Sequence, residues 1–454
     1  MAVIAPLKGI VYNTSTAGNL RDLVGPPYDV VTPKEQTAFH QAHKNNVMHL
    51  ILGAGHPDDQ SPYDWHQRAA ATFNQWLKDE ILIRQEQPAI YYKELDFTDP
   101  MTGQRKTRHG FVTLLKLEDF NEKARVRPHE RTFSSTKAER LDLMLNVNAN
   151  LSQIFAVYSD EERESPRIFK SQIEREPVFD FMDPEGRGHR VWPITDLSVI
   201  QTLSKFMLDK TVYIADGHHR YETALNYRRI KAERGVKFSP QSSLNYTMVY
   251  LCAISDPGLA ILPAHRLISN TLSLSKKELE TSLERFFHVQ TFSYSRVEER
   301  ATRRAFLRQL QREDRTGNAL GLFTHLAKTY YLLKLRNAIA KETSLDAWAP
   351  PLRKLDTVVL TALVLQEIIG LTEKGLDDPK RITYTSRAGD AIRQVNEGQV
   401  EMACILNPTR IEHVQAVAEA GLIMPSKSTY FFPKVITGLI FNLLDPSEEI
   451  EAAL

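Results

Sequence analysis

Apolar and polar positions along the chain predict a mixture of strands and helices. Residues 63–83 place large apolar side chains three and four positions apart, which is typical of an amphipathic helix, whereas residues 108–117 alternate as a strand does. Residues 211–215 form an apolar strand, and helical periodicity resumes over residues 221–234. Because no regular strand–helix–strand repeat joins these elements, the pattern predicts an α+β fold with mixed sheets and packed helices.

The same pattern divides the chain into three predicted segments. Residues 1–150 form an N-terminal α+β segment, in which Thr32, Pro33 and Glu35 carry the signature of a helix start. Residues 151–270 form a core, and residues 271–454 form a C-terminal α/β region. For this last region we expect helices at residues 275–286, 297–311, 355–369, 388–397 and 410–420.

Composition narrows the class of protein. The 454 residues contain 57 Lys and Arg against 56 Asp and Glu, a net charge of +1, which argues against a nucleic-acid scaffold. Apolar runs are shorter than a membrane helix requires, and the N-terminus lacks the pattern of a signal peptide. We therefore expect a cytoplasmic protein with no membrane partner.

The clearest polar cluster follows the strand at residues 211–215 and reads Asp216, Gly217, His218, His219 and Arg220. A glycine permits a tight reversal, and the helix that follows presents unpaired N–H groups to an anion. Arg220 offers a planar fork for phosphate oxygens, and Asp216 and His218 are candidate catalytic groups. A simpler structural role for Asp216 is to cap the helix. Adjacent histidines diverge on either a strand or a helix, so a zinc site is not favoured and the metal stays unassigned.

A second cluster combines cations, a histidine, a carboxylate and a hydroxyl within six residues: Arg127, Pro128, His129, Glu130, Arg131 and Thr132. These residue types serve both phosphate binding and acid–base chemistry. A solvated run of charges is the alternative interpretation.

Two further clusters are candidate substrate or phosphate sites. Lys427, Ser428 and Thr429 have the residue types of a phosphate cradle, although the GxxxxGK[ST] pattern of a P-loop is absent. His265 and Arg266 directly follow a predicted strand.

Taken in order along the chain, these motifs resemble the DUF1015 family, and the match spans nearly the whole sequence. The segments that carry the resemblance are residues 26–30 (PPYDV), 127–132 (RPHERT), 215–224 (ADGHHRYETA), 263–266 (PAHR) and 424–434 (MPSKSTYFFPK).

The Asp-Gly-His-His-Arg segment also resembles the phosphate-handling box of the ParB/sulfiredoxin-like group, which includes free-serine kinases. This resemblance implies a ParB-like core in which Gly217 through Arg220 cradle the phosphates of ATP or ADP, accompanied by Mg²⁺. A carboxylate would then deprotonate the acceptor hydroxyl, and Asp29 and Glu130 are the candidates.

The resulting hypothesis is a nucleotide-dependent kinase that phosphorylates a small hydroxylated metabolite, with free serine as the first candidate. One alternative is a ParB-like nucleic-acid-binding or nucleotide-switch protein, although residues 399–454 contain no basic helix. Another is phosphoester hydrolysis at the same anion site. Sulfiredoxin chemistry is disfavoured because neither Cys252 nor Cys404 has a cationic motif beside it. The sequence leaves the oligomeric state open.

Overall fold

The chain forms two compact units. The computed structural model describes residues 1–61, 64–121, 123–130, 134–269, 274–324, 326–337 and 343–452. The first unit contains the described parts of residues 1–128, 132–260 and 433–454, and the second contains those of 129–131 and 261–432. The predicted segments 1–150 and 151–270 thus lie largely in one unit, to which the last residues of the chain return.

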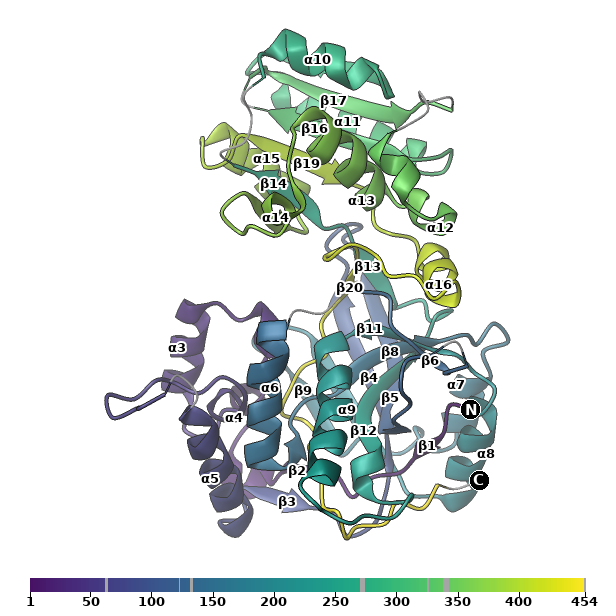
Figure 1. Ribbon diagram of the computed structural model, residues 1–454. Helices are drawn as coiled ribbons and strands as arrows, with labels where there is room; N and C mark the ends of the chain where they lie inside the picture. Colours follow the sequence, from purple (N-terminus) through teal and green to yellow (C-terminus); the bar gives the residue numbers. More distant parts are fainter. Residues whose placement is uncertain are drawn as a thin grey trace. The chain divides into compact units, whose positions relative to one another are not determined.

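A mixed sheet forms the centre of the first unit (Figure 1). Its strands follow the order β6-β11-β8-β12-β5-β4-β10-β9, and β1 pairs with β5. The pairs β11–β6 and β12–β8 are parallel and the other pairs are antiparallel. The strands are β1 (Ile4–Ala5), β4 (Ile90–Thr98), β5 (Arg105–Lys116), β6 (Val126–Arg127), β8 (Ile154–Tyr158), β9 (Phe179–Met182), β10 (Gly188–Ile194), β11 (Val212–Asp216) and β12 (Tyr246–Ala253).

Some helices of the first unit begin where a side chain satisfies the first N–H groups. In α3 the predicted capping box is present, because Thr32 accepts from the N–H of Glu35 and Glu35 accepts from that of Thr32. Asp196 caps α8 in a similar way. The helices are α1 (Thr14–Ala17), α2 (Leu20–Leu23), α3 (Pro33–Ala42), α4 (Met48–Ile51), α5 (Trp65–Lys78), α6 (Ser134–Val147), α7 (Glu164–Phe169), α8 (Leu197–Met207) and α9 (His218–Glu233).

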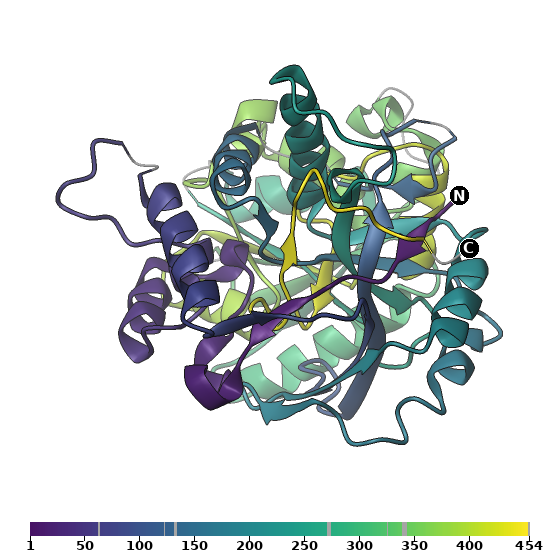
Figure 2. The ribbon, with the colours of Figure 1, turned by 90° about the horizontal axis from the view of Figure 1, so that it is seen from below.

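The C-terminal segment returns to the first unit and runs beside its N-terminal segment (Figure 2). Phe441 pairs with Ile10, and Thr437 pairs with Gly25. Two small sheets reinforce this arrangement, one made by β2 (Ile10–Tyr12) and β3 (Leu82–Arg84), the other by β21 (Asn442–Leu443) and β7 (Ala149–Asn150). Residues near 434 are therefore held beside elements that are far away in sequence.

The second unit is built on an antiparallel sheet with the strand order β15-β17-β16-β19-β14-β18. Alternate residues of its strands enter two separate cores: Tyr331 and Leu333 face one, and Tyr330 and Leu332 face the other. Both faces of the sheet are therefore covered. The strands are β13 (Ala260–Leu262), β14 (His265–Ile268), β15 (Phe287–Ser293), β16 (Ala319–Thr324), β17 (Thr329–Leu335), β18 (Ile382–Thr385), β19 (Met402–Leu406) and β20 (Tyr430–Phe432), of which β13 pairs with β20.

Helices cover both faces of this second sheet. The predicted helix over residues 355–369 is present from Asp356, and from Leu360 it continues as a π-helix. Apolar spacings of three and four do not separate an α-helix from this wider one. The helices are α10 (Lys276–Glu284), α11 (Glu299–Glu313), α12 (Pro350–Arg353), α13 (Asp356–Val359), the π-helix η4 (Leu360–Ile368), α14 (Glu373–Leu376), α15 (Ala388–Asn396) and α16 (Ile411–Glu419).

The predicted combination of mixed sheets and packed helices is confirmed. Residues 160–193, for which the alternation of charges with Pro and Gly predicts a variable strand-and-loop connection, contain the strand β9 and the inner strand β10, and in addition the helix α7. Within the described residues, no helix is long and apolar enough to span a lipid bilayer.

Candidate functional site

Asp216 lies where β11 ends and α9 begins. The register of β11 against β8 shifts between Ile214 and Asp216, so the strand bulges immediately before the site. One carboxylate oxygen of Asp216 accepts from Nη2 of Arg220 at 2.7 Å, one helical turn further on. The other oxygen contacts the ammonium group of Lys434.

Gly217 makes the tight reversal that the sequence predicts. Its φ is +95°, in the left-handed region, and α9 begins directly after it at His218. The predicted helix started at Tyr221, so the two histidines and Arg220 lie in the first helical turn rather than in a loop. Gly217, at the N-cap position, has no side chain with which to cap this turn. The N-terminus of a helix, with its N–H groups and the positive end of the helix dipole, is an element that binds anions.

Replacing Gly217 with Ala should destabilise the fold strongly. The new Cβ would lie 2.8 Å from Nε of Arg220, in addition to the unfavourable φ. We expect a loss of about 2 kcal/mol in the free energy of unfolding, measured by urea denaturation.

Gly235, after the C-terminus of the same helix, is the matched control. Its φ is +79° and a Cβ there would meet nothing within 4 Å. Gly235→Ala should therefore cost only the backbone strain, roughly 1 kcal/mol. Equal losses in the two variants would contradict the close packing of Arg220 against Gly217.

Lys434 connects two carboxylates of the first unit. Its Nζ contacts Asp216 and lies 3.7 Å from Oδ2 of Asp29. The Lys434 and Asp216 side chains are only 13% and 14% exposed, whereas that of Asp29 is 31% exposed. Asp29 is thus the carboxylate of this group that solvent and a ligand reach most easily.

These contacts keep the buried pair ionised. Burial opposes ionisation of Asp216, but the charges of Lys434 and Arg220 outweigh it and hold its pKa well below the usual range. Burial also disfavours the ammonium form of Lys434, yet Asp216 and Asp29 raise its pKa above the usual range. Both groups are therefore charged at neutral pH.

Arg220, Tyr28 and Arg140 line a small cavity of about 50 Å³ beside this group. Nη1 of Arg220 donates to the carbonyl oxygen of Gln153 and Nη2 donates to Asp216, so both terminal nitrogens are engaged within the chain. The guanidinium of Arg140 lies over the Tyr28 ring, 4.2 Å from its centre. Burial raises the pKa of Tyr28, and the charges of Arg220 and Arg140 oppose that rise. The cavity has room for a small group but not for a whole nucleotide.

A second group of predicted residues lies in the other unit. Nε2 of His129 hydrogen-bonds with Oγ1 of Thr429 at 3.2 Å, and Glu130 accepts from the N–H of Lys427 at 3.1 Å. Ser428 donates to the carbonyl oxygen of Pro425 at 2.6 Å. The bonds of His129 and Glu130 join two motifs that are about 300 positions apart in sequence.

His265 and Arg266 are buried in β14 of the same unit. The N–H of Leu406 donates to Nδ1 of His265 at 3.1 Å, and burial, followed by the charge of Arg266, lowers the pKa of His265 to about 3. Arg266 donates to the carbonyl oxygen of Ala264 at 2.5 Å and lies over the ring of Tyr384. His265 is therefore neutral at physiological pH.

The buried His265 should make stability depend on pH. Its pKa is depressed in the folded state, so its contribution is present above the unfolded value of 6.5 and is lost as pH falls towards 3. An Asn at this position keeps an acceptor for Leu406 but does not ionise. We expect the unfolding free energy of His265→Asn to decline less than that of the natural chain between these pH values, measured by urea denaturation. Parallel curves would contradict a buried neutral histidine.

The structure thus distributes the predicted site residues between the two units. Asp29, Asp216, Gly217, His218, His219 and Arg220 lie in the first unit, together with Arg127, which donates to the carbonyl oxygen of Asn121. His129, Glu130, His265, Arg266, Lys427, Ser428 and Thr429 lie in the second unit. Arg131 and Thr132 fall outside the described residues.

Sequence reasoning missed three members of the first group: Lys434, Tyr28 and Arg140. Tyr28 and Lys434 belong to the motifs at residues 26–30 and 424–434. Their position in these motifs is the sequence feature that could have identified them as site residues. Arg140 lies in an ordinary helical pattern and carries no such signal.

The described residues do not assemble a metal centre by themselves, since no three His, Cys, Asp or Glu side chains come together. Asp29 and Asp216 nevertheless supply the carboxylate oxygens that Mg²⁺ accepts when nucleotide phosphates provide its other ligands. The group therefore fits a magnesium ion that arrives with a nucleotide better than a resident metal.

Comparisons with known proteins show remote structural likeness. A conserved hypothetical protein from Pyrococcus furiosus is 12% identical, with 69% of this chain and 92% of that chain covered and a TM-score of 0.32. A mutant free serine kinase in complex with ADP is 10% identical, with coverages of 69% and 89% and a TM-score of 0.33. SbnI from Staphylococcus aureus, truncated at its C-terminus, is 10% identical, with coverages of 74% and 90% and a TM-score of 0.35.

No curated protein matches the sequence. The family model described as "Protein of unknown function (DUF1015)" matches residues 4–358, which is more than half of the chain. This span includes the reversal at Gly217 and both carboxylates that contact Lys434. The chain belongs to the DUF1015 family.

Proposed function

We propose that this protein is a nucleotide-dependent kinase that phosphorylates a small hydroxylated metabolite, with free serine as the first candidate. The observation that carries the proposal is the first turn of α9, which begins directly after the reversal at Gly217, next to the ionised group Asp216, Lys434 and Asp29. A helix N-terminus, a buried cation and an accessible carboxylate are the parts that phosphoryl transfer requires.

The phosphates of ATP or ADP would bind at the first turn of α9. The backbone N–H groups of that turn and the positive end of the helix dipole attract the anion, and the absence of a Cβ at Gly217 allows close approach. Arg220 acts indirectly in this arrangement, because its bonds to Asp216 and Gln153 fix the end of β11. The ammonium of Lys434 offsets the negative charge of Asp216 and Asp29, which would otherwise repel the phosphates.

Asp29 is our candidate for the general base. The acceptor hydroxyl would attack the terminal phosphorus, forming a new O–P bond as the bond to the leaving nucleotide oxygen breaks. The hydroxyl proton would pass to the carboxylate of Asp29. Glu130, the other candidate, lies in the second unit and accepts the backbone N–H of Lys427.

Magnesium would accompany the nucleotide and neutralise charge on the transferring phosphoryl group. Asp29 and Asp216 are the side chains of this group with suitable oxygen atoms. Because Asp216 already contacts both Lys434 and Arg220, and Asp29 is assigned to the acceptor hydroxyl, the nucleotide phosphates would supply most of the ligands of the ion.

Incubation of the purified chain with Mg·ATP or Mg·ADP and a panel of hydroxylated amino acids tests the proposal. Phosphorus NMR should show a phosphomonoester of the acceptor, and alanine, which lacks the hydroxyl, should give none. Inorganic phosphate without a phosphorylated acceptor would indicate the hydrolase instead. Absence of both products, together with no nucleotide binding by calorimetry, would reject the proposal.

A further inference from the structure

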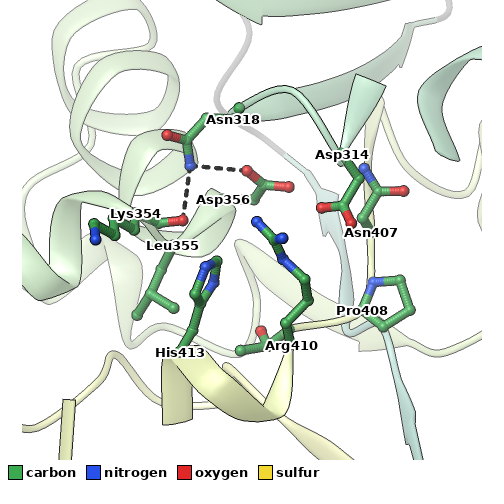
Figure 3. Close-up of a pocket in the computed structure, with 11 residues that line it drawn as sticks. Asp314, Asn318, Lys354, Leu355, Asp356, Asn407, Pro408, Arg410 and His413 are labelled. Carbon is green, nitrogen blue, oxygen red and sulfur yellow. Dashed lines mark hydrogen bonds between the residues drawn. The ribbon is translucent and has the colours of Figure 1, made fainter. Parts of the chain in front are cut away.

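The second unit contains a polar cavity that is separate from the phosphate site proposed in the first unit. It has a volume of about 200 Å³, smaller than a typical site for a drug-sized ligand. The end of α11, the residues that precede α13, and the start of α16 enclose it (Figure 3). Its polar lining includes Asp314, Asn318, Lys354, Asp356, Asn407, Thr409, Arg410 and His413.

Both signs of charge meet in this cavity. The guanidinium of Arg410 points towards the space between the carboxylates of Asp314 and Asp356 (Figure 3). Within the described part of the chain, Arg410 makes no ion pair within 4.0 Å and no side-chain hydrogen bond, although its charge acts on both carboxylates. Three charged groups thus approach one another without closing into a salt bridge.

The surroundings of both carboxylates disfavour their ionised forms. Burial, together with the charge of the nearby Asp314, raises the pKa of Asp356 to about 7, although Asn318 and Arg410 oppose the rise. Burial also raises the pKa of Asp314. An additional cation placed beside these two groups would favour their ionised forms.

A purely structural role explains part of this arrangement. Nδ2 of Asn318 donates to Asp356 at 2.9 Å and to the carbonyl oxygen of Lys354 at 3.0 Å, which ties the turn before β16 to the start of α13. This network accounts for Asn318 and for one oxygen of Asp356. It does not account for Arg410, which takes no part in it.

We propose that this cavity binds a small zwitterion of the α-amino acid class, whose carboxylate pairs with Arg410 and whose ammonium group pairs with Asp356 and Asp314. A simple anion would face two carboxylates, and a simple cation would face Arg410 and Lys354. A ligand with one charge of each sign pairs with both the anionic and the cationic side chains, and an amino acid is small enough for the cavity. The inference goes beyond the proposed kinase function and does not depend on it.

Binding should also move a proton. An ammonium group beside Asp356 lowers the pKa of that carboxyl from about 7, so binding near neutral pH releases a proton and tightens as pH rises through this range. The charged or titratable groups that line the cavity around Asp356 are Asp314, Lys354, Arg410 and His413. Burial, followed by the charge of Arg410, lowers the pKa of His413, which is therefore mostly neutral over the same range.

Calorimetry and thermal-shift measurements on the full chain, without nucleotide, test the site. The probes are the standard L-amino acids. Each is added at a concentration about ten times higher than a Kd in the millimolar range. For alanine, the matched analogues are lactate, which lacks the ammonium group, and ethylamine, which lacks the carboxylate. We expect one or more amino acids to bind and to release a proton, and the analogues not to bind. Binding of lactate as tightly as alanine, or no binding by any amino acid, would overturn the proposal.

Two variants and a control locate the binding. Asp356→Asn keeps an acceptor for Asn318, and Arg410→Gln removes the guanidinium; each should weaken amino-acid binding at least about tenfold. Arg312→Gln, at an exposed position of α11 outside the cavity, should bind as the natural chain does. Because alanine has no hydroxyl to phosphorylate, its binding is independent of the kinase assay. Undiminished binding in both cavity variants would place the amino acid elsewhere and overturn the proposal.

Discussion

Replacing Lys434 with Met should cost about 3 kcal/mol in the free energy of unfolding and lower phosphoryl transfer at least about a hundredfold. The substitution leaves the buried carboxylate of Asp216 with Arg220 as its remaining ion-pair partner. It also removes the cation that neutralises Asp29. Urea denaturation measures the first effect and the rate of phosphoserine formation measures the second.

The double variant Asp216→Asn/Lys434→Met separates stability from function. Because it removes both charges, it should recover much of the stability that Lys434→Met loses, without recovering phosphoryl transfer. Recovery of both would mean that Lys434 has only a structural role. No destabilisation in the single variant would contradict the buried ion pair itself.

The same pair predicts how stability varies with pH. The pKa of Asp216 is depressed in the folded state, so its contribution is present above the unfolded value of 3.8 and is lost as pH falls below it. The pKa of Lys434 is raised, so its contribution is present below 10.5 and is lost at higher pH. Between these limits the pair stabilises the fold at a constant level.

Replacing Asp29 with Asn should lower phosphoryl transfer by about 10²–10⁴-fold while changing stability by less than about 1 kcal/mol. The reason for the first effect is that an amide does not accept the hydroxyl proton. The second effect is small because Asp29 is the most exposed member of its group and lies 3.7 Å from Lys434. Single-turnover kinetics with bound nucleotide measures the rate of the chemical step.

Asp22→Asn is the matched control, because it makes the same change at an exposed carboxylate of the same unit. It should leave both rate and stability unchanged. Glu130→Gln tests the other candidate base. If this variant loses a comparable part of the phosphoryl-transfer rate while Asp29→Asn keeps full activity, the base is Glu130.

Local features of the fold were predictable because they depend on neighbouring residues. The start of α3 follows from Thr32 and Glu35, which lie three positions apart and satisfy each other's backbone groups. Gly235 ends α9 in the left-handed conformation that a glycine adopts easily. The prediction of an anion site at the polar residues after β11 rests on the same kind of local pattern.

Features that depend on tertiary pairing were not predictable. Lys434 contacts Asp216 across 218 positions because the C-terminal segment returns to the first unit, which no local pattern encodes. The sequence predicts strands and loops over residues 160–193, but the inner position of β10 depends on its pairing with β4 and β9, which the local pattern does not encode. Arg266 likewise owes its burial to strand pairing rather than to its own polarity.

Calorimetric titration of Mg·ADP and Mg·ATP into the natural chain and into Gly217→Ala tests whether nucleotide phosphates bind at the first turn of α9. We expect one nucleotide site per chain, weakened at least about tenfold in Gly217→Ala, while Gly235→Ala binds normally. A natural chain that binds neither nucleotide, or a Gly217→Ala variant that binds both as tightly as the natural chain, would contradict a phosphate site at the first turn of α9.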